Sequence, residues 1–146
     1  MQTRLFTLVL GLFYLVIGII SFIPALYTHP PASAPHLTVT ASYGYLFGIF
    51  PVNAVADIFN IVIGLVAVAV SSRMEAAAAY CRALFPLFGI LAVMGFMPQT
   101  NTVWGLAPIL DGDTWVHAVT AILAAYFGFV APAPSYVAPA PQHAHS

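Results

Sequence analysis

The chain has 146 residues, of which 62% are hydrophobic and only 5% are charged. Soluble domains carry about 25% charged residues, so this chain has too few charges to cover a surface that faces water. We therefore expect a membrane protein whose main partner is the lipid bilayer. The formal net charge of −1 and the lack of a basic run exclude nucleic acid as a partner.

The first apolar segment, Leu5–Leu26, is long enough to cross a bilayer. A signal peptide is the alternative, because Arg4 precedes the segment and residues 32–34 resemble a cleavage site. However, the apolar run of about 22 residues exceeds the roughly 7–15 of a signal core and fits a spanning helix. Pro35 directly after the cleavage-like site also argues against cleavage.

The second and third spanning segments are predicted at Val52–Val70 and Ala76–Met97. The link between them, Ser71–Glu75, is so short that we expect a tight antiparallel hairpin. Pro86 lies within the third segment and predicts a kink. The earlier link, Tyr27–Phe50, is rich in proline and aromatic residues, which favours an interfacial or re-entrant segment.

The fourth spanning segment, Trp115–Ala131, follows a link at Pro98–Thr114. The tail, Pro132–Ser146, is rich in alanine and proline, which predicts a disordered segment. The expected fold class is therefore all-α: a polytopic membrane protein with four transmembrane helices in an antiparallel bundle, formed by residues 1–131 as a single domain.

Three positive charges predict the topology. With four spans, Arg4, Arg73 and Arg82 all fall on one side of the membrane. The positive-inside rule then places both termini in the cytoplasm.

Polar residues interrupt the second apolar segment. Asn53, Asp57 and Asn60 are spaced i, i+4, i+7, which puts them on one helix face. A carboxylate at bilayer depth costs roughly 2.5–3.5 kcal/mol, so its presence there points to a role. Asp113 and His117 enter the fourth segment from the same side. We therefore predict that all five residues form a polar intramembrane cluster in the outer half of the bundle.

Two roles remain open for this cluster. An Asp57–His117 contact would make a proton-responsive or ligand-binding pocket, whereas the same groups could serve only as hydrogen-bonded contacts between helices. Arg82 enters from the opposite side, so we expect it to reach the inner headgroups rather than Asp57. Asp113 also has a structural role open to it, as the cap of the fourth helix.

Several enzyme classes are disfavoured, because the sequence contains no H-E-x-x-H, G-x-S-x-G or P-loop. The single cysteine, Cys81, excludes an internal disulfide and an all-cysteine metal site. Only His117 lies inside a span, which leaves ligation of one pigment or haem iron as an alternative. We predict a non-enzymatic protein with no metal and no other cofactor.

Two stretches carry a resemblance. F-P-V-N-A-V-A-D-I-F-N-I-V-I-G-L (Phe50–Leu65) and W-G-L-A-P-I-L-D-G-D-T-W-V-H (Trp104–His117) resemble a family of small bacterial four-helix membrane proteins catalogued as domain of unknown function 4383. The family has histidines where this chain has Ala56 and Asn60, and an asparagine at Asp57. The resemblance implies a four-helix fold in a bacterial inner membrane, with an internal photosynthetic membrane as the alternative. It implies no established activity.

The leading expectation is an accessory or scaffold protein that packs against itself or a larger membrane complex. The chain is too small for a complete transport path, and glycines line its predicted helices. The alternative is a small transporter or sensor whose pocket is built from Asn53, Asp57, Asn60 and His117.

Overall fold

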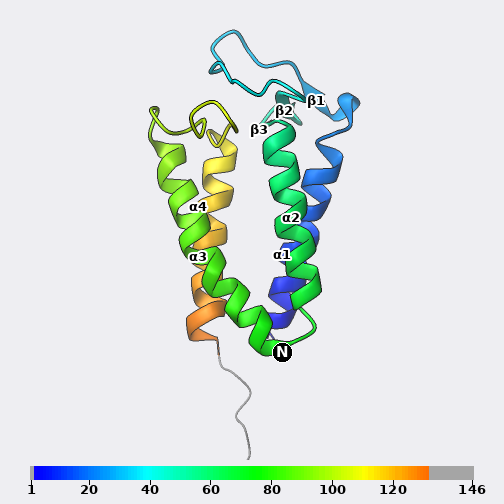
Figure 1. Ribbon diagram of the computed structural model, residues 1–146, viewed down its shortest axis with the longest axis vertical. Helices are drawn as coiled ribbons and strands as arrows, with labels where there is room; N and C mark the ends of the chain where they lie inside the picture. Colours follow the sequence, from blue (N-terminus) through cyan, green and yellow to red (C-terminus); the bar gives the residue numbers. More distant parts are fainter. Residues whose placement is uncertain (1, 132–146) are drawn as a thin grey trace, which may run out of the picture.

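The computed structural model describes residues 2–131 and contains four long helices and a small sheet at one end of them (Figure 1). The helices are α1 (Gln2–Ile20), α2 (Ala54–Val70), α3 (Met74–Phe96) and α4 (Gly112–Ala125), and a π-helical turn, η2 (Tyr126–Val130), continues α4. The link after α1 holds a 3₁₀ turn, η1 (Pro24–Leu26), and β1 (Tyr27–Thr28), β2 (Gly44–Leu46) and β3 (Phe50–Val52). The strands pair antiparallel in the order β1-β2-β3. The predicted tail, 132–146, lies outside the described residues.

Three of the helices are long and apolar enough to cross a membrane: α1, α3, and α4 together with η2. α2 is also apolar, but with 17 residues it reaches about 26 Å, somewhat less than the ~30 Å hydrocarbon core. The second span was predicted to begin at Val52. Instead, Pro51 and Val52 pair with β2, and α2 begins only after Asn53.

The first predicted segment was too long at its C-terminal end. α1 ends at Ile20, and the chain then passes through η1 into β1. The following link folds over the ends of the helices (Figure 1), where β2 is fully buried. This sheet was not predicted, because strands of two or three residues are too short to show a periodic pattern.

The helices associate as two pairs, α1 with α2 and α3 with α4 (Figure 1). The predicted tight hairpin of α2 and α3 is therefore wrong in its packing, although the link between them is short. α3 contains Pro86 and bends, so α2 and α3 meet near their link and diverge toward the sheet (Figure 1). Glycines allow α1 and α2 to approach closely, because a Cβ on Gly64 would lie 2.7 Å from the carbonyl oxygen of Gly11.

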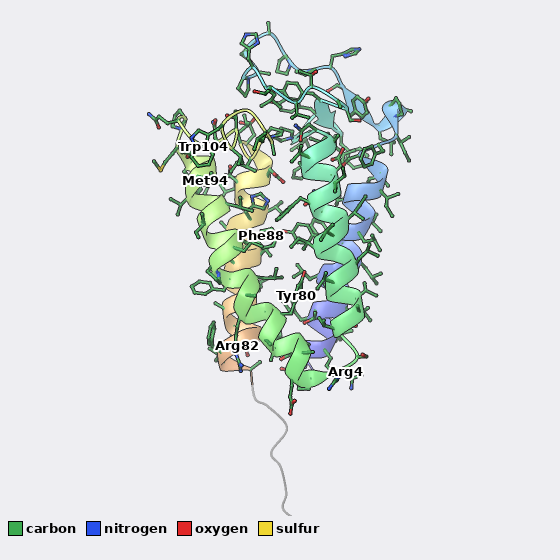
Figure 2. All side chains as sticks on the ribbon, in the orientation of Figure 1. Arg4, Tyr80, Arg82, Phe88, Met94 and Trp104 are labelled. Atoms are coloured by element: carbon green, nitrogen blue, oxygen red, sulfur yellow. The ribbon has the colours of Figure 1, made fainter. Side chains whose placement is uncertain are left out.

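A buried core joins the two pairs. The Phe88 side chain of α3 is fully buried between them, 5.1 Å from the Tyr14 ring of α1 (Figure 2). The Tyr14 hydroxyl shares a hydrogen bond of 2.7 Å with Thr120 of α4. The Tyr80 hydroxyl of α3 donates to the carbonyl oxygen of Ile63 on α2, at 2.6 Å. Large apolar side chains on the outer helix faces remain exposed, as expected for helices surrounded by lipid.

The arginines gather at the end of the bundle opposite the sheet, which we call the arginine end. The Arg4 Nε donates to Ser71 O at 3.1 Å, and the Arg82 Nε donates to Gly128 O at 2.7 Å. Both described ends of the chain lie here too (Figures 1 and 2). Arg82 thus satisfies a backbone carbonyl of the π-helical turn. Arg73, at the start of α3, lies in the short link at the same end.

Candidate functional site

Asn53 has a structural role at the opposite end, the sheet end. Its fully buried side chain accepts a hydrogen bond from Ala56 N at 3.0 Å, which caps α2. Its amide nitrogen donates to Val39 O at 3.0 Å and to Leu106 O at 2.8 Å. Asn53 therefore ties both long links to the start of α2, and both hydrogens of its side-chain amide are used within the protein.

Asp57 lies in the interface of α1 and α2. A Cβ on Gly18 of α1 would lie 2.7 Å from the Asp57 backbone oxygen, which shows how close the two helices are. The carboxyl group is fully buried, and neither oxygen has a hydrogen-bond partner among the described residues. The neighbouring Ser21 hydroxyl donates instead to Ile17 O at 2.8 Å. The structure therefore does not bring Asp57 into hydrogen-bond contact with His117.

His117 faces a different carboxylate. Its Nε2 lies 3.7 Å from Asp113 Oδ2, one helical turn earlier on α4. The imidazole is 3% exposed, the Asp113 side chain is 21% exposed, and the His117 Nδ1 has no partner among residues 2–131. The Phe88 ring packs 5.2 Å away, centroid to centroid. Buried polarity is thus concentrated on one face of the first turns of α4.

The predicted cap of the fourth helix is wrong in its position. α4 begins at Gly112, so Asp113 lies within its first turn and Asp111 occupies the cap position. A carboxylate in the first turn is still favoured by the helix dipole. Thr114 fixes this turn, because its hydroxyl donates to Ile109 O at 2.8 Å.

A cavity of about 210 Å³ opens beside Asp113 and His117. Asn60 of α2 is its third polar side chain, and the other walls are apolar and come from α2, α3 and the loop after α3. The lining residues are Val55, Ala56, Phe59, Asn60, Leu91, Val103, Ala107, Ile109, Asp113 and His117. We call this space the sheet-end cavity.

A second, smaller cavity lies on the α1 side of Asn60 and Asp113. It measures about 60 Å³, enough for a few water molecules, and Tyr14 contributes to its wall. Ala56, Asn60 and Asp113 line both cavities, so these three residues lie between them.

Of the five predicted cluster residues, the structure brings three together at one cavity: Asn60, Asp113 and His117. Sequence reasoning missed the loop 98–111, which supplies Val103, Ala107 and Ile109 to the cavity wall. A signal was present, because the run G-L-A-P-I-L (105–110) is too apolar for a solvated link. Ala107 and Ile109 are indeed buried.

The charged side chains are divided unevenly between the two ends of the bundle, with the acidic Glu75 lying at the arginine end. Three aspartates lie at the sheet end, and the three arginines lie at the arginine end: Asp57, Asp111 and Asp113 against Arg4, Arg73 and Arg82. Tyr45 of β2 donates to Asp111 Oδ2 at 3.5 Å. Burial and the nearby Asp111 carboxylate raise the pKa of Tyr45 to about 12, so this phenol stays neutral at physiological pH. Within residues 2–131, no arginine or lysine side chain lies at the sheet end to offset the aspartates.

The described residues do not provide a set of ligands for a metal ion. Within residues 2–131, no group of three or more histidine, cysteine, aspartate or glutamate side chains is placed to hold a metal ion. Asp113 and His117 alone make an acid–imidazole pair, which can accept or donate hydrogen bonds to a small molecule.

Most of the chain matches one protein family. Residues 4–130 match the family described as a domain of unknown function, DUF4383. The chain therefore belongs to this family, which confirms the resemblance seen in Phe50–Leu65 and Trp104–His117. No curated protein and no solved structure matches the chain.

Proposed function

We propose that this member of the DUF4383 family is an integral membrane protein that binds a small ligand in the sheet-end cavity, as a small sensor or transporter. The observation that carries the proposal is the cavity itself. It is mainly apolar, and three polar side chains, Asn60, Asp113 and His117, converge on it. Ligand sites typically combine apolar walls with a few placed polar groups of this kind.

The buried His117 supports this proposal. A buried imidazole nitrogen without a hydrogen-bond partner costs free energy, and such groups are uncommon in folded proteins. The Nδ1 of His117 is in this state among the described residues, next to a space that can hold another molecule. A bound ligand or water would supply the missing partner.

The proposal includes a membrane arrangement. α2 also spans the membrane, which completes an antiparallel bundle of four spans, and the sheet covers its shortfall in length at the outer boundary. Both termini lie in the cytoplasm with the arginines, in agreement with the positive-inside rule, and the membrane is the bacterial inner membrane. The sheet-end cavity then opens toward the outer face.

Blocking the cavity should release its occupant. Val55 lines the cavity and is 38% exposed, so Val55→Trp should fill the space without disturbing the buried core. We expect native mass spectrometry of protein extracted gently from its own membranes to show a bound small molecule. Its occupancy should fall at least about tenfold in the variant, because tenfold corresponds to only ~1.4 kcal/mol of binding free energy.

Ile58→Trp is the matched control, since Ile58 lies on the same helix, is 56% exposed and does not line the cavity. It should keep the wild-type occupancy. Equal occupancy in the wild type and both variants would place any bound molecule elsewhere, and a wild-type protein without a bound molecule would remove the support for a resident ligand.

The second candidate is an accessory protein that packs against itself or a larger membrane complex. The observation in its favour is an apolar groove of about 550 Å³ between α1 and α4, lined by Val9, Phe13, Trp115 and Val119 among others. A helix of a neighbouring subunit would fill this groove and bury side chains that are now exposed.

The native mass of the gently extracted protein distinguishes this second candidate. An accessory role predicts a particle whose mass exceeds that of one chain by whole subunits, with fixed stoichiometry. A particle of one chain plus lipid would reject it and leave the ligand-binding role untouched.

A further inference from the structure

We infer that the sheet-end cavity takes a small organic cation, an ammonium group carried on an apolar body, with the Asp113 carboxylate facing the positive charge. This inference rests on the proposed ligand-binding function and adds the chemical class of the ligand. It follows from three features of the cavity: its charge, its size and its walls.

The charge of the surroundings selects against an anion. Asp113 lines the cavity, and its ion-pair partner within 4 Å among the described residues is the His117 imidazole, while the buried Asp57 carboxyl is a further acidic neighbour. The arginines lie at the other end, with about 24 Å of α1 between Arg4 and the helix end at Ile20. An anion would therefore meet a carboxylate with no arginine or lysine side chain beside it, whereas a cation would be its counter-ion.

The helix that carries Asp113 keeps this carboxylate available. Asp113 lies in the first turn of α4, where the helix dipole favours negative charge. Its side chain remains 21% exposed, so it is reachable from the cavity. Asp57, by contrast, is fully buried between α1 and α2 and does not line this space.

The size and walls of the cavity define the rest of the ligand. Drug-sized ligands occupy pockets of roughly 300–1,000 Å³, so about 210 Å³ suits a smaller molecule such as one ring with a short substituent. Val55, Phe59 and Leu91 offer apolar and aromatic contact to its body. The face of an aromatic ring such as Phe59 also attracts an organic ammonium group.

The experiment compares two probes that share a benzyl group and differ in charge. Benzyltrimethylammonium and benzylsulfonate are titrated separately into the full chain, held in phosphatidylcholine nanodiscs at physiological salt, with calorimetric detection. The zwitterionic lipid carries no net charge that would collect either probe. We expect saturable binding of the cation and at least about tenfold weaker binding of the sulfonate.

Two aspartate variants locate the charge that matters. Asp113→Asn should weaken cation binding at least about tenfold, whereas Asp111→Asn should change it less than about threefold. Both substitutions remove one negative charge from the sheet end, but only Asp113 lines the cavity. Thermal unfolding of each variant verifies that it is folded, and the comparison of the two probes on the wild type needs no variant at all.

Each contrary outcome overturns the inference in a distinct way. Preferred binding of the sulfonate, or no saturable binding of the cation, rejects the cationic class. Equal losses in the two aspartate variants reject Asp113 as the counter-ion. If Val55→Trp abolishes binding of the sulfonate, the ligand-binding function survives with a different ligand class. The resident-ligand experiment above judges that function separately.

Discussion

Gly64→Ala is expected to lower the free energy of unfolding by about 3 kcal/mol, the upper end of the range for overpacked interiors. A Cβ at Gly64 would lie 2.5 Å from the backbone nitrogen of Leu15 and 2.7 Å from Gly11 O, both on α1. Backbone atoms cannot rotate away as a flexible side chain can, so α1 and α2 would have to separate along their length. Reversible unfolding in mixed detergent micelles would measure the loss.

Gly89→Ala is the matched control for this prediction. Gly89 lies within α3, and nothing lies within 4 Å of its would-be Cβ. The substitution removes the helix penalty of glycine, so stability should stay unchanged or rise by up to about 1 kcal/mol. Equal losses for the two variants would show that the close α1–α2 approach does not contribute to stability.

Asn53→Ala is expected to lower the free energy of unfolding by about 3 kcal/mol or more. The substitution removes a helix cap worth ~1 kcal/mol and leaves Val39 O and Leu106 O without their donor, at roughly 1–3 kcal/mol for each buried group. The loops at residues 39 and 106 should also loosen. Hydrogen exchange should therefore accelerate at the Thr38 amide, which donates to Gly105 O at 2.8 Å.

Two further substitutions define what Asn53 does. Asn53→Ser keeps a capping oxygen but loses both donated hydrogen bonds. It should therefore be only about 1 kcal/mol more stable than Asn53→Ala. Asn60→Ala removes the same type of side chain from the cavity wall. It should lower the free energy of unfolding by less than about 1 kcal/mol, since Asn60 lines two cavities. If Asn53→Ala and Asn60→Ala cost the same, the assignment of Asn53 to structure and Asn60 to the cavity is wrong.

The membrane class of this protein could be read directly from composition and segment length. Apolar runs of about 20 residues favour helices whatever their neighbours are, because in lipid only a helix satisfies its own backbone. For the same reason the approximate positions of α1, α3 and α4 could be predicted, and the family followed from Phe50–Leu65 and Trp104–His117.

Element ends were harder to predict, since they depend on contacts between distant residues. α2 begins at Ala54 rather than Val52 because Val52 pairs with Gly44 of β2 and Asn53 binds two loops. The two loop partners of Asn53, Val39 and Leu106, lie 14 and 53 residues away in the sequence. Pairing into α1–α2 and α3–α4 likewise depends on glycine contacts that a single segment does not reveal.

The sequence by itself determined which residues are polar within the apolar segments, and it predicted that they would meet at one end. Only the tertiary structure decided how they divide. The backbone of Asp57 packs against Gly18 of α1 and its carboxyl group lies near Ser21, whereas the Asn60 side chain lines the cavity. His117 meets Asp113 because both lie on one face of α4. The site therefore depends on how the helices are rotated against each other, which is set by packing across the whole bundle.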